Sequence, residues 1–352
     1  MQGFVMLSRI TVQGLFGEFD YDLILKDGPL TYIHAQNGNG KSTLMRLVCN
    51  LFQGNLEEVR TTPFQRLTLY FDNGSKLIVT NRNQELSVLM CQNRLEEELD
   101  QDEICNLQNT VYIGPERLYQ VSGDGHIVPA LDIYMDELAA SVRKANSDSD
   151  LRPGKDDGGK YTDADLDQMF KNIEAKLAFI KQAGFAPTIT SGLRFPPTRY
   201  EIGEKRDAYR ALAFALKDYV DRYYEFAESI VVFKDIVNAL FVNKSIVLSE
   251  KGSIQARMDR SGTVIPISKF SSGEKQVLIM FYLLLFRTRP HSLVVIDEPE
   301  VSLHVSWQQQ LGKYMKDVAR VRGLRLLVST HSPSVIHDDW DLAVELGQTK
   351  AD

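Results

Sequence analysis

Cysteine, long apolar runs and an excess of basic charge are all lacking in this chain. Its 352 residues include only three cysteines, Cys49, Cys91 and Cys105. They match no metal-ligand spacing, so we expect reduced thiols in a cytosolic protein. The longest apolar run, VLIMFYLLLF at residues 277–286, is too short to span a bilayer as a helix. The first residues also lack the basic start and apolar core of a signal peptide, so we expect an intracellular, soluble protein.

The formal net charge of −7 gives the chain no general attraction for nucleic acid or for an anionic membrane. A local basic patch is still compatible with this balance. The hydrophobic share of 43% and the charged share of 25% are ordinary for a soluble globular protein. The length allows two or three structural units with a substantial core.

The first part of the chain predicts β-strands. Apolar or alternating runs occupy residues 8–12, 30–34, 65–71 and 76–80. An Asn-Gly pair between the last two is a strong hairpin signal. The runs ELSVLMC and TVYIG extend the β-rich texture to about Gly114. We assign residues 1–125 to a first lobe.

The middle of the chain, residues 126–244, predicts a helical insertion. Residues 144–165 are polar, glycine-rich and acidic, which predicts a flexible loop. Apolar residues three or four apart predict one helix over 166–180 and a continuous one over 200–230. We expect their apolar stripes to pack as a short antiparallel pair and to form core rather than a partner-binding surface.

The last part, residues 245–352, predicts an α/β lobe. After strands that include residues 254–258, a long helix should start at about Gly273. HSLVVIDE and LRLLVST are short continuous apolar runs, typical of parallel strands buried on both faces. A segment of helical length and content, residues 302–322, separates them. No internal repeat is evident.

The stretch TYIHAQNGNGKSTLMRLVCN (residues 31–50) predicts a phosphate-binding loop between a strand and a helix. It satisfies G-x-x-x-x-G-K-[ST] except at the first position, where Ala35 replaces glycine. Glycines permit close backbone approach, and the following helix start adds a positive end. Lys41 can reach β- and γ-phosphates, while Ser42 offers a hydroxyl to Mg²⁺ and Thr43 another to phosphate. The residues expected to contact ATP here are Asn37, Gly38, Asn39, Gly40, Lys41, Ser42 and Thr43. A turn with a chance lysine is the alternative, which the flanking strand and helix disfavour.

A carboxylate pair follows the buried run SLVVIDEPE. Asp297 at the strand end is placed to hold Mg²⁺, directly or through water. Glu298 can take a proton from an attacking water if it lies within hydrogen-bond reach. Acidic residues after a strand can also simply begin a turn, but the phosphate-binding loop favours the functional interpretation.

Two further motifs fit the same chemistry. KFSSGEKQVL places Ser271, Ser272 and Gly273 before a helix, where backbone N–H groups can bind an anion. LLVSTHSP ends a strand at His331, which could donate to a γ-phosphate or hold the attacking water. Alone, the first is also a common helix cap and the second an ordinary surface histidine.

In this order the motifs resemble an ABC-type ATPase head of the OLD-like and SMC-like branch. The resemblance covers roughly residues 1–125 and 245–347. AQNGNGKST corresponds to Walker A, FSSGEKQ to the signature, LVVIDEPE to Walker B, EPEVSLHVSW to the D-loop region and STHS to the switch histidine. DEPE followed by LH, STHSP and YIGPER with Glu116 and Arg117 are close to the OLD-like style.

The resemblance implies an α/β fold: a P-loop mixed sheet with an antiparallel β subdomain, interrupted by the helical insertion. It also implies ATP and Mg²⁺ as cofactors and a homodimer with ATP sandwiched between heads. Ser271–Gly273 of one head would close on the Walker A loop of the other. ATP would then shift the equilibrium toward engaged heads.

The chain departs from the family in several places. Ala35 lacks the first glycine, and Ser272 and Glu274 stand where transporters usually have glycine and glutamine. The Q-loop glutamine is not placed, and Gln108 and Gln120 both qualify. The insertion is far shorter than the arms of cohesin-like proteins, which disfavours long-range tethering.

OLD nucleases carry a metal-dependent nuclease domain after the switch histidine. Here only about twenty residues follow, too few for any domain, so we expect none. His337, Asp338 and Asp339 offer metal-type side chains, but no partner ligands are evident and a solvated tail explains them.

Three functions compete on these grounds. The leading hypothesis is the ATPase subunit of a bacterial anti-phage system that scaffolds or controls a separate nuclease or toxin. The second is an SMC- or RecF-like DNA-repair ATPase, which would bind DNA in an ATP-dependent, salt-sensitive manner. A transporter subunit is disfavoured by the insertion and by the DEPE…LH style.

Overall fold

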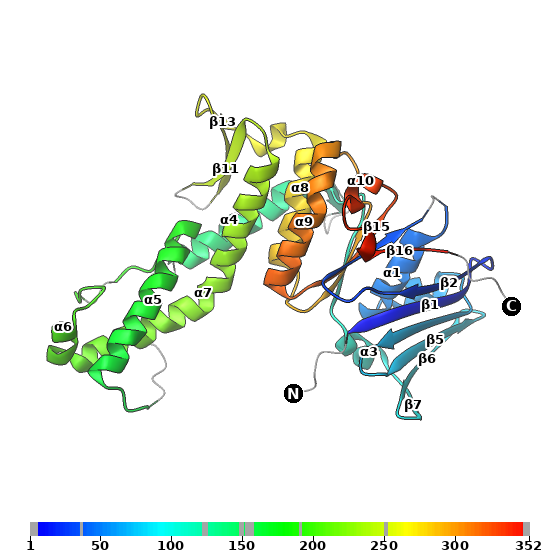
Figure 1. Cartoon of the computed structure of the whole chain (residues 1–352), viewed down its shortest axis with the longest axis horizontal. Coiled ribbons are helices and arrows are strands. Elements are labelled where there is room, and N and C mark those ends of the chain that lie inside the picture. The colour runs from blue at the N-terminus through cyan, green and yellow to red at the C-terminus, as the bar shows by residue number, and fades with distance from the viewer. Residues whose placement is uncertain are drawn as a thin grey trace. The chain divides into compact units, whose positions relative to one another are not determined.

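The computed structural model describes residues 6–35, 38–121, 126–147, 151, 158–189, 192–249 and 253–347. The chain forms two compact units (Figure 1). Unit 1 consists of residues 1–117 and 283–352, and unit 2 of residues 118–282. Within the described ranges, no helix combines the length and the apolarity needed to cross a bilayer.

Unit 1 contains a six-stranded antiparallel sheet with the order β2-β1-β4-β5-β6-β7. Leu77 and Val79 of β5 are buried between less buried neighbours, as expected of a strand with one face on a core. Gly74 (φ 81°) makes the tight turn of the predicted Asn-Gly hairpin, confirming it. The strands are β1 (Leu7–Leu15), β2 (Phe19–Ile24), β4 (Arg66–Phe71), β5 (Lys76–Arg82), β6 (Glu85–Gln92) and β7 (Leu95–Glu98).

A second sheet in unit 1 has five strands in the order β16-β3-β15-β14-β8, and every neighbouring pair is parallel. All five residues of β14 are buried, as expected of a parallel strand with both faces covered. The structure therefore confirms the predicted α/β class with a parallel sheet. The strands are β3 (Leu30–His34), β8 (Thr110–Ile113), β14 (Leu293–Asp297), β15 (Arg325–Thr330) and β16 (Ala343–Glu345).

Helices α1 and α9 pack on the parallel sheet. The apolar side of α1 (Lys41–Phe52) shares one core with Val295 of β14 and with the inner residues of the antiparallel sheet. Helix α9 (Val305–Arg322) contacts β3 and β15, and its Gly312 lies against the hydroxyl of Tyr32. The remaining helical segments of unit 1 are α2 (Leu56–Thr61), α3 (Gln101–Leu107), the π-helical η2 (Leu283–Arg287), α10 (Pro333–Ile336) and η3 (Trp340–Leu342).

Unit 2 is mainly helical. It contains α4 (Ala130–Ser147), α5 (Asp163–Ala183), α6 (Arg199–Glu204), α7 (Arg206–Leu240) and α8 (Ser272–Tyr282). A two-stranded ribbon pairs β9 (Tyr119–Val121) with β10 (Ile127–Pro129). A three-stranded sheet joins β11 (Lys244–Leu248), β12 (Ile254–Met258) and β13 (Val264–Ile265), followed by η1 (Ile267–Lys269).

The helix pair of unit 2 differs from the prediction in direction. Phe170 of α5 packs on Tyr209 of α7, and Phe179, further along α5, packs on Tyr224. Contacts that advance together along both helices mean that α5 and α7 run parallel, so the predicted antiparallel pairing is wrong. The segment between the helices explains the difference, because it returns along α5 and places Phe195 against Phe170.

The predicted continuous helix over 200–230 is also wrong in detail. Lys205 leaves helical geometry with φ −128° and ψ 46°, and it separates α6 from α7. The predicted loop at 144–165 is shorter in the structure, because residues 144–147 belong to α4 and residues 163–165 to α5. Its residues 148–150 and 152–157 lie outside the described residues. Residues 245–282 lie in unit 2 together with the helices of the predicted insertion. The predicted domain boundaries at 125/126 and 244/245 stay predictions.

Candidate functional site

The carboxyl ends of three parallel strands bring the predicted motifs of unit 1 together. Asp297 at the end of β14 pairs in register with Ser329 of β15. Thr330, the last residue of β15, pairs with His34 at the end of β3. Because parallel strands end at one edge, the segments after β3, β14 and β15 all emerge there.

The loop after β3 leads into the amino-terminal end of α1. Gly38 (φ 89°) and Gly40 (φ 68°) adopt left-handed backbone angles that favour glycine. A Cβ on Gly40 would lie 3.1 Å from Leu15 Cδ2, so close packing also favours a bare backbone there. No side chain of the described residues caps α1, and no acidic residue occupies its first turn. This helix start is therefore open to an anion.

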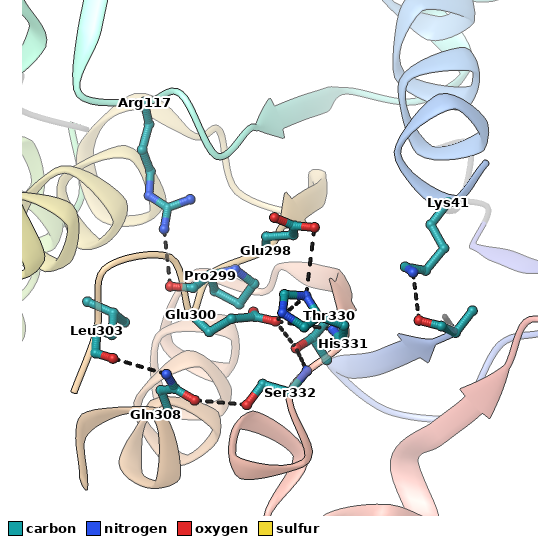
Figure 2. Close-up of polar contacts among 11 residues, drawn as sticks. Lys41, Arg117, Glu298, Pro299, Glu300, Leu303, Gln308, Thr330, His331 and Ser332 are labelled. Carbon is teal, nitrogen blue, oxygen red and sulfur yellow. Dashed lines mark hydrogen bonds and ion pairs between the residues drawn. The ribbon is translucent and has the colours of Figure 1, made fainter. Parts of the chain in front are cut away.

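Lys41 is the first residue of α1 and is 6% exposed. Its Nζ donates to the carbonyl oxygen of Ala35 at 2.7 Å, across the loop (Figure 2). Burial lowers the pKa of Lys41, and the negative charges of Glu298, Asp297 and Glu300 oppose that shift. The lysine of the loop therefore lies in the field of the carboxylates that follow β14.

The other predicted residues of this loop are placed as follows. Ser42 and Thr43 are the second and third residues of α1 and are partly buried. The carbonyl oxygen of Asn39 accepts a hydrogen bond from the hydroxyl of Tyr21 at 2.9 Å, which fixes the loop from the antiparallel sheet. Asn37 lies outside the described residues.

Asp297 is 1% exposed. Its Oδ2 accepts a hydrogen bond from the Tyr112 hydroxyl at 2.8 Å, and Arg46 Nε donates to that hydroxyl oxygen at 3.1 Å. Its Oδ1 is buried and has no hydrogen-bond partner in the described part of the chain. A buried carboxylate oxygen without a donor is costly unless a ligand completes it, and Mg²⁺ prefers such oxygens. Asp297 therefore fits a magnesium ligand.

Glu298 has an unusual backbone. Its φ of 47° is left-handed, and its N–H donates to the carbonyl oxygen of Ser329 at 2.9 Å. Such angles cost energy in a residue other than glycine and are typical of functional sites. The turn leaves the Glu298 side chain 32% exposed, so its carboxylate can meet water at the edge of the sheet.

Sequence reasoning assigned no role to Glu300, yet the structure buries it at 6% exposure. Its Oε1 accepts hydrogen bonds from the Thr330 hydroxyl at 2.6 Å and from the His331 N–H at 3.1 Å. Glu300 thus joins the end of β15 to the segment after β14. In the sequence, Glu300 is visible only as the second glutamate of DEPE, and no local pattern predicts that it is buried.

His331 lies beside both glutamates (Figure 2). Its Nδ1 is 3.3 Å from Glu300 Oε1 and 3.7 Å from Glu298 Oε1. Its side chain is 45% exposed. Next to it, the Ser332 hydroxyl donates to Gln308 Oε1 at 2.8 Å, which ties the loop after β15 to α9.

Arg117 supplies a buried positive charge behind the segment after β14. Its guanidinium donates to the carbonyl oxygens of Gly114 at 3.0 Å and Pro299 at 3.1 Å. Burial lowers the pKa of Arg117 to about 10, and the charges of Glu300 and Asp297 oppose this. Arg117 therefore holds the DEPE turn from the end of β8.

The predicted signature residues lie in unit 2. The Ser271 N–H donates to Glu274 Oε2 at 2.9 Å and the Glu274 N–H donates to Ser271 Oγ at 3.3 Å, which forms a capping box at the start of α8. Ser271 and Ser272 are exposed and Gly273 is buried. The other carboxylate oxygen of Glu274 pairs with Lys244 at 2.7 Å. Ser271 thus caps α8, as the alternative interpretation of this motif predicts.

One of the two Q-loop candidates, Gln108, lies away from the residues at the sheet edge. Gln108 precedes β8, at the amino ends of the strands, and its Nε2 donates to the carbonyl oxygen of His291 at 3.3 Å. That is the edge opposite Asp297, so Gln108 is excluded as the Q-loop glutamine. Gln120 lies in unit 2, where its side chain hydrogen-bonds to the hydroxyl of Tyr134.

The acidic segment near the carboxyl terminus forms ordinary ion pairs. Lys316 binds both oxygens of Asp339, at 2.7 Å and 2.8 Å, and His337 pairs with its neighbour Asp338. The described ranges contain no group of three or more histidine, cysteine or acidic residues able to hold a metal ion. His337, Asp338 and Asp339 therefore carry no metal assignment.

Comparison with known families adds one match. A family model described as "AAA domain, putative AbiEii toxin, Type IV TA system" matches residues 131–337, more than half of the chain. The chain belongs to this AAA domain family. The matched part of the AAA domain contains Asp297, Glu298 and His331, and Lys41 precedes it.

The solved structures similar to the chain include two of Smc heads. One is the Smc head domain with an extended coiled coil from Pyrococcus furiosus, bound to the C-terminal domain of ScpA, with 14% identity, TM-score 0.46 and coverage of 94% of this chain and 91% of that one. The other is an Smc head bound to the C-winged helix domain of ScpA, with 14% identity, TM-score 0.48 and coverage of 94% and 90%. A comparison with curated protein sequences gives no match.

Proposed function

We propose that this AAA protein binds ATP with Mg²⁺ and hydrolyses it at the carboxyl edge of the parallel sheet. The observation that carries the proposal is that the segments of Lys41, Asp297 and Glu298 leave the parallel sheet at one edge, although Lys41 lies more than 250 positions from the other two in the sequence. A cation at an open helix start, facing a carboxylate with an unpaired oxygen, is the arrangement that a magnesium-bound triphosphate requires.

Each residue has a distinct role in the proposal. The backbone from Asn37 to Thr43 binds the phosphates, and Lys41 exchanges its bond with Ala35 for the β- and γ-phosphates. Ser42 and Asp297 hold Mg²⁺, which supplies charge neutralisation on the phosphates when it is bound. Glu298 accepts the proton of the attacking water, since its carboxylate reaches solvent whereas that of Glu300 is buried.

Assembly is the second part of the proposal. Ser271, Ser272 and Gly273 of one copy complete the ATP site of a second copy, in a head-to-head homodimer. Two of these residues are exposed, as a surface that meets another molecule requires. ATP then acts as a bridging ligand, and hydrolysis releases the heads.

The cellular role completes the proposal. The family description names a toxin of a toxin–antitoxin system. We infer that the dimer controls or scaffolds a separate effector, a nuclease or toxin, in bacterial anti-phage defence in the cytoplasm.

The test combines ATPase assays with native mass measurement. Purified protein should release phosphate from ATP only with Mg²⁺, and its mass should double when ATP is added under conditions that block hydrolysis. Purification with neighbouring gene products should recover an effector. A solitary protein without ATPase activity and without a phage phenotype on deletion would refute the proposal, and ATP-dependent, salt-sensitive DNA binding would favour a repair ATPase instead.

A further inference from the structure

We propose that Glu300 is a positioning residue that holds His331 by its Nδ1 and thereby keeps Glu298 free for the attacking water. The inference rests on the proposed ATPase function and assigns a role to a glutamate that the Walker B pattern leaves without one. It starts from the observation that two carboxylates approach one imidazole nitrogen.

The two carboxylates are not equivalent partners for that nitrogen. Glu300 Oε1 lies 3.3 Å from His331 Nδ1 and Glu298 Oε1 lies 3.7 Å away. Glu300 is also the more rigid of the two, because its Oε1 already accepts bonds from the Thr330 hydroxyl and the His331 N–H. A carboxylate held in place by two donors loses little conformational freedom when it accepts a third.

Burial strengthens the contact with Glu300. The Glu300 side chain is 5% exposed, whereas that of Glu298 is 32% exposed. Interactions between charged or polar groups weaken as water surrounds them, so the buried carboxylate is the stronger partner. The positive charge of buried Arg117 interacts with Glu300 as well.

The consequence for His331 concerns its tautomer and its direction. An Nδ1–H that donates to Glu300 leaves Nε2 as the nitrogen available to a phosphate or a water. A carboxylate that orients an imidazole in this way acts through the histidine, since Glu300 itself is enclosed by protein. Without it, His331 would turn to Glu298 and occupy the carboxylate that must accept the proton of water.

Glu300→Gln tests this with little change of shape. Its amide oxygen can still accept from Thr330 and from the His331 backbone, but the negative charge beside Nδ1 is lost. We expect kcat for ATP hydrolysis to fall about 10- to 100-fold, with KM for ATP within about threefold of wild type. An unchanged kcat in a folded Glu300→Gln protein would overturn the proposal.

A double variant separates positioning from a general structural effect. If Glu300 acts through His331, His331→Ala combined with Glu300→Gln should be no slower than His331→Ala alone. Multiplied losses in the double variant would show that Glu300 acts independently of the histidine. Wild-type protein without any ATPase activity would instead refute the proposed function, so the two failures are distinguishable.

Two further variants guard against unfolding. Glu300→Asp retains the charge near Arg117 but withdraws it by one methylene, so it should fold and still lose turnover. Asn81→Ala removes two hydrogen bonds from β5 to the carbonyl oxygens of Arg60 and Thr62 in unit 1. It should lower the melting temperature and leave kcat unchanged. A loss of kcat in Asn81→Ala equal to that in Glu300→Gln would assign both losses to stability and overturn the inference.

Discussion

The two units treat buried carboxylates in different ways, although each also holds other buried polar atoms without a hydrogen-bond partner in the described ranges, such as Gln276 Oε1 in unit 2. At the sheet edge of unit 1, Asp297 Oδ1, Glu300 Oε2 and Ser329 Oγ are buried without a hydrogen-bond partner among the described residues. In unit 2 the helix starts at Thr162 and Thr198 are closed by complete capping boxes, and Asp167 pairs with two cations. Unpaired buried atoms cost free energy and persist where a ligand completes them. We therefore place the proposed nucleotide site of one copy in unit 1, and we regard unit 2 as a rigid unit that presents the signature residues to a second copy.

Aromatic packing gives unit 2 this rigidity. Phe170 packs on Tyr209, Phe185 on Tyr223 and Tyr134 on Tyr282. Such pairs stabilise a helix bundle without placing charge inside it. Cations lie over several of its rings, and one of them is Lys244, whose ammonium lies over the ring of Phe270 at 4.6 Å and pairs with Glu274 beside the signature residues.

The largest effect on ATP binding is expected for Lys41→Ala, which tests whether the ATP site lies in unit 1. Lys41→Ala should abolish productive ATP binding, because it removes the only charge of the loop after β3 that can reach the terminal phosphates. Calorimetric titration with ATP and Mg²⁺ measures it. Lys313→Ala, an exposed lysine on α9, is the matched control and should bind as wild type does. Retained affinity in Lys41→Ala would move the ATP site elsewhere.

Glu298→Gln should separate binding from turnover. Its neutral amide cannot accept a proton from water, so hydrolysis should fall about 10²- to 10⁴-fold while ATP still binds. Phosphate release and ATP titration on the same preparation measure the two quantities. Near-wild-type turnover would remove Glu298 from the role of base, and the strained φ of 47° would then need another explanation.

The meeting of these two residues was predictable from sequence because two simple rules suffice. The buried run before Asp297 and the β-branched run before Ala35 each mark a strand, and parallel strands end at one edge. Lys41 needs only the glycine-rich pattern that precedes it. Local patterns therefore placed both halves of the site without any knowledge of the contacts between them.

Glu300 and Arg117 were out of reach for the opposite reason. Both are charged residues in turns, where local pattern predicts solvent exposure. Their burial depends on β8, β14 and β15 lying side by side. This arrangement lets Arg117 donate to the carbonyl oxygen of Pro299 and lets Glu300 accept from the Thr330 hydroxyl. The direction of α7 was equally hidden, because an apolar stripe indicates a packed face and says nothing about which way the partner runs.

A variant in the core of unit 2 tests the same contrast, because it should lower stability without changing ATP affinity. Phe170→Ala should destabilise the protein by about 3–5 kcal/mol, because the ring is 2% exposed and packs on Tyr209 and Phe195. ATP affinity at low temperature should stay at the wild-type value. Denaturant unfolding and ATP titration measure the two effects. Tyr200→Ala, which truncates a ring that is 74% exposed, is the control and should unfold as wild type does. A loss of ATP affinity in Phe170→Ala would contradict the division of roles.

The smallest effect is expected for a substitution of Arg117, the buried cation of unit 1. Arg117→Met keeps the length of the side chain but removes the donors to Gly114 and Pro299 and the positive charge near Glu300. Two buried carbonyl oxygens and a buried carboxylate lose their compensation, so we expect a destabilisation of about 2–3 kcal/mol. Denaturant midpoints measure it, with Arg320→Met as the matched control, since that side chain is 68% exposed and its loss should be nearly neutral. Equal midpoints for the two variants would mean that the charge of Arg117 contributes nothing to the stability of the fold. The contrast between the units would then rest on the unpaired carboxylate oxygens of unit 1 alone.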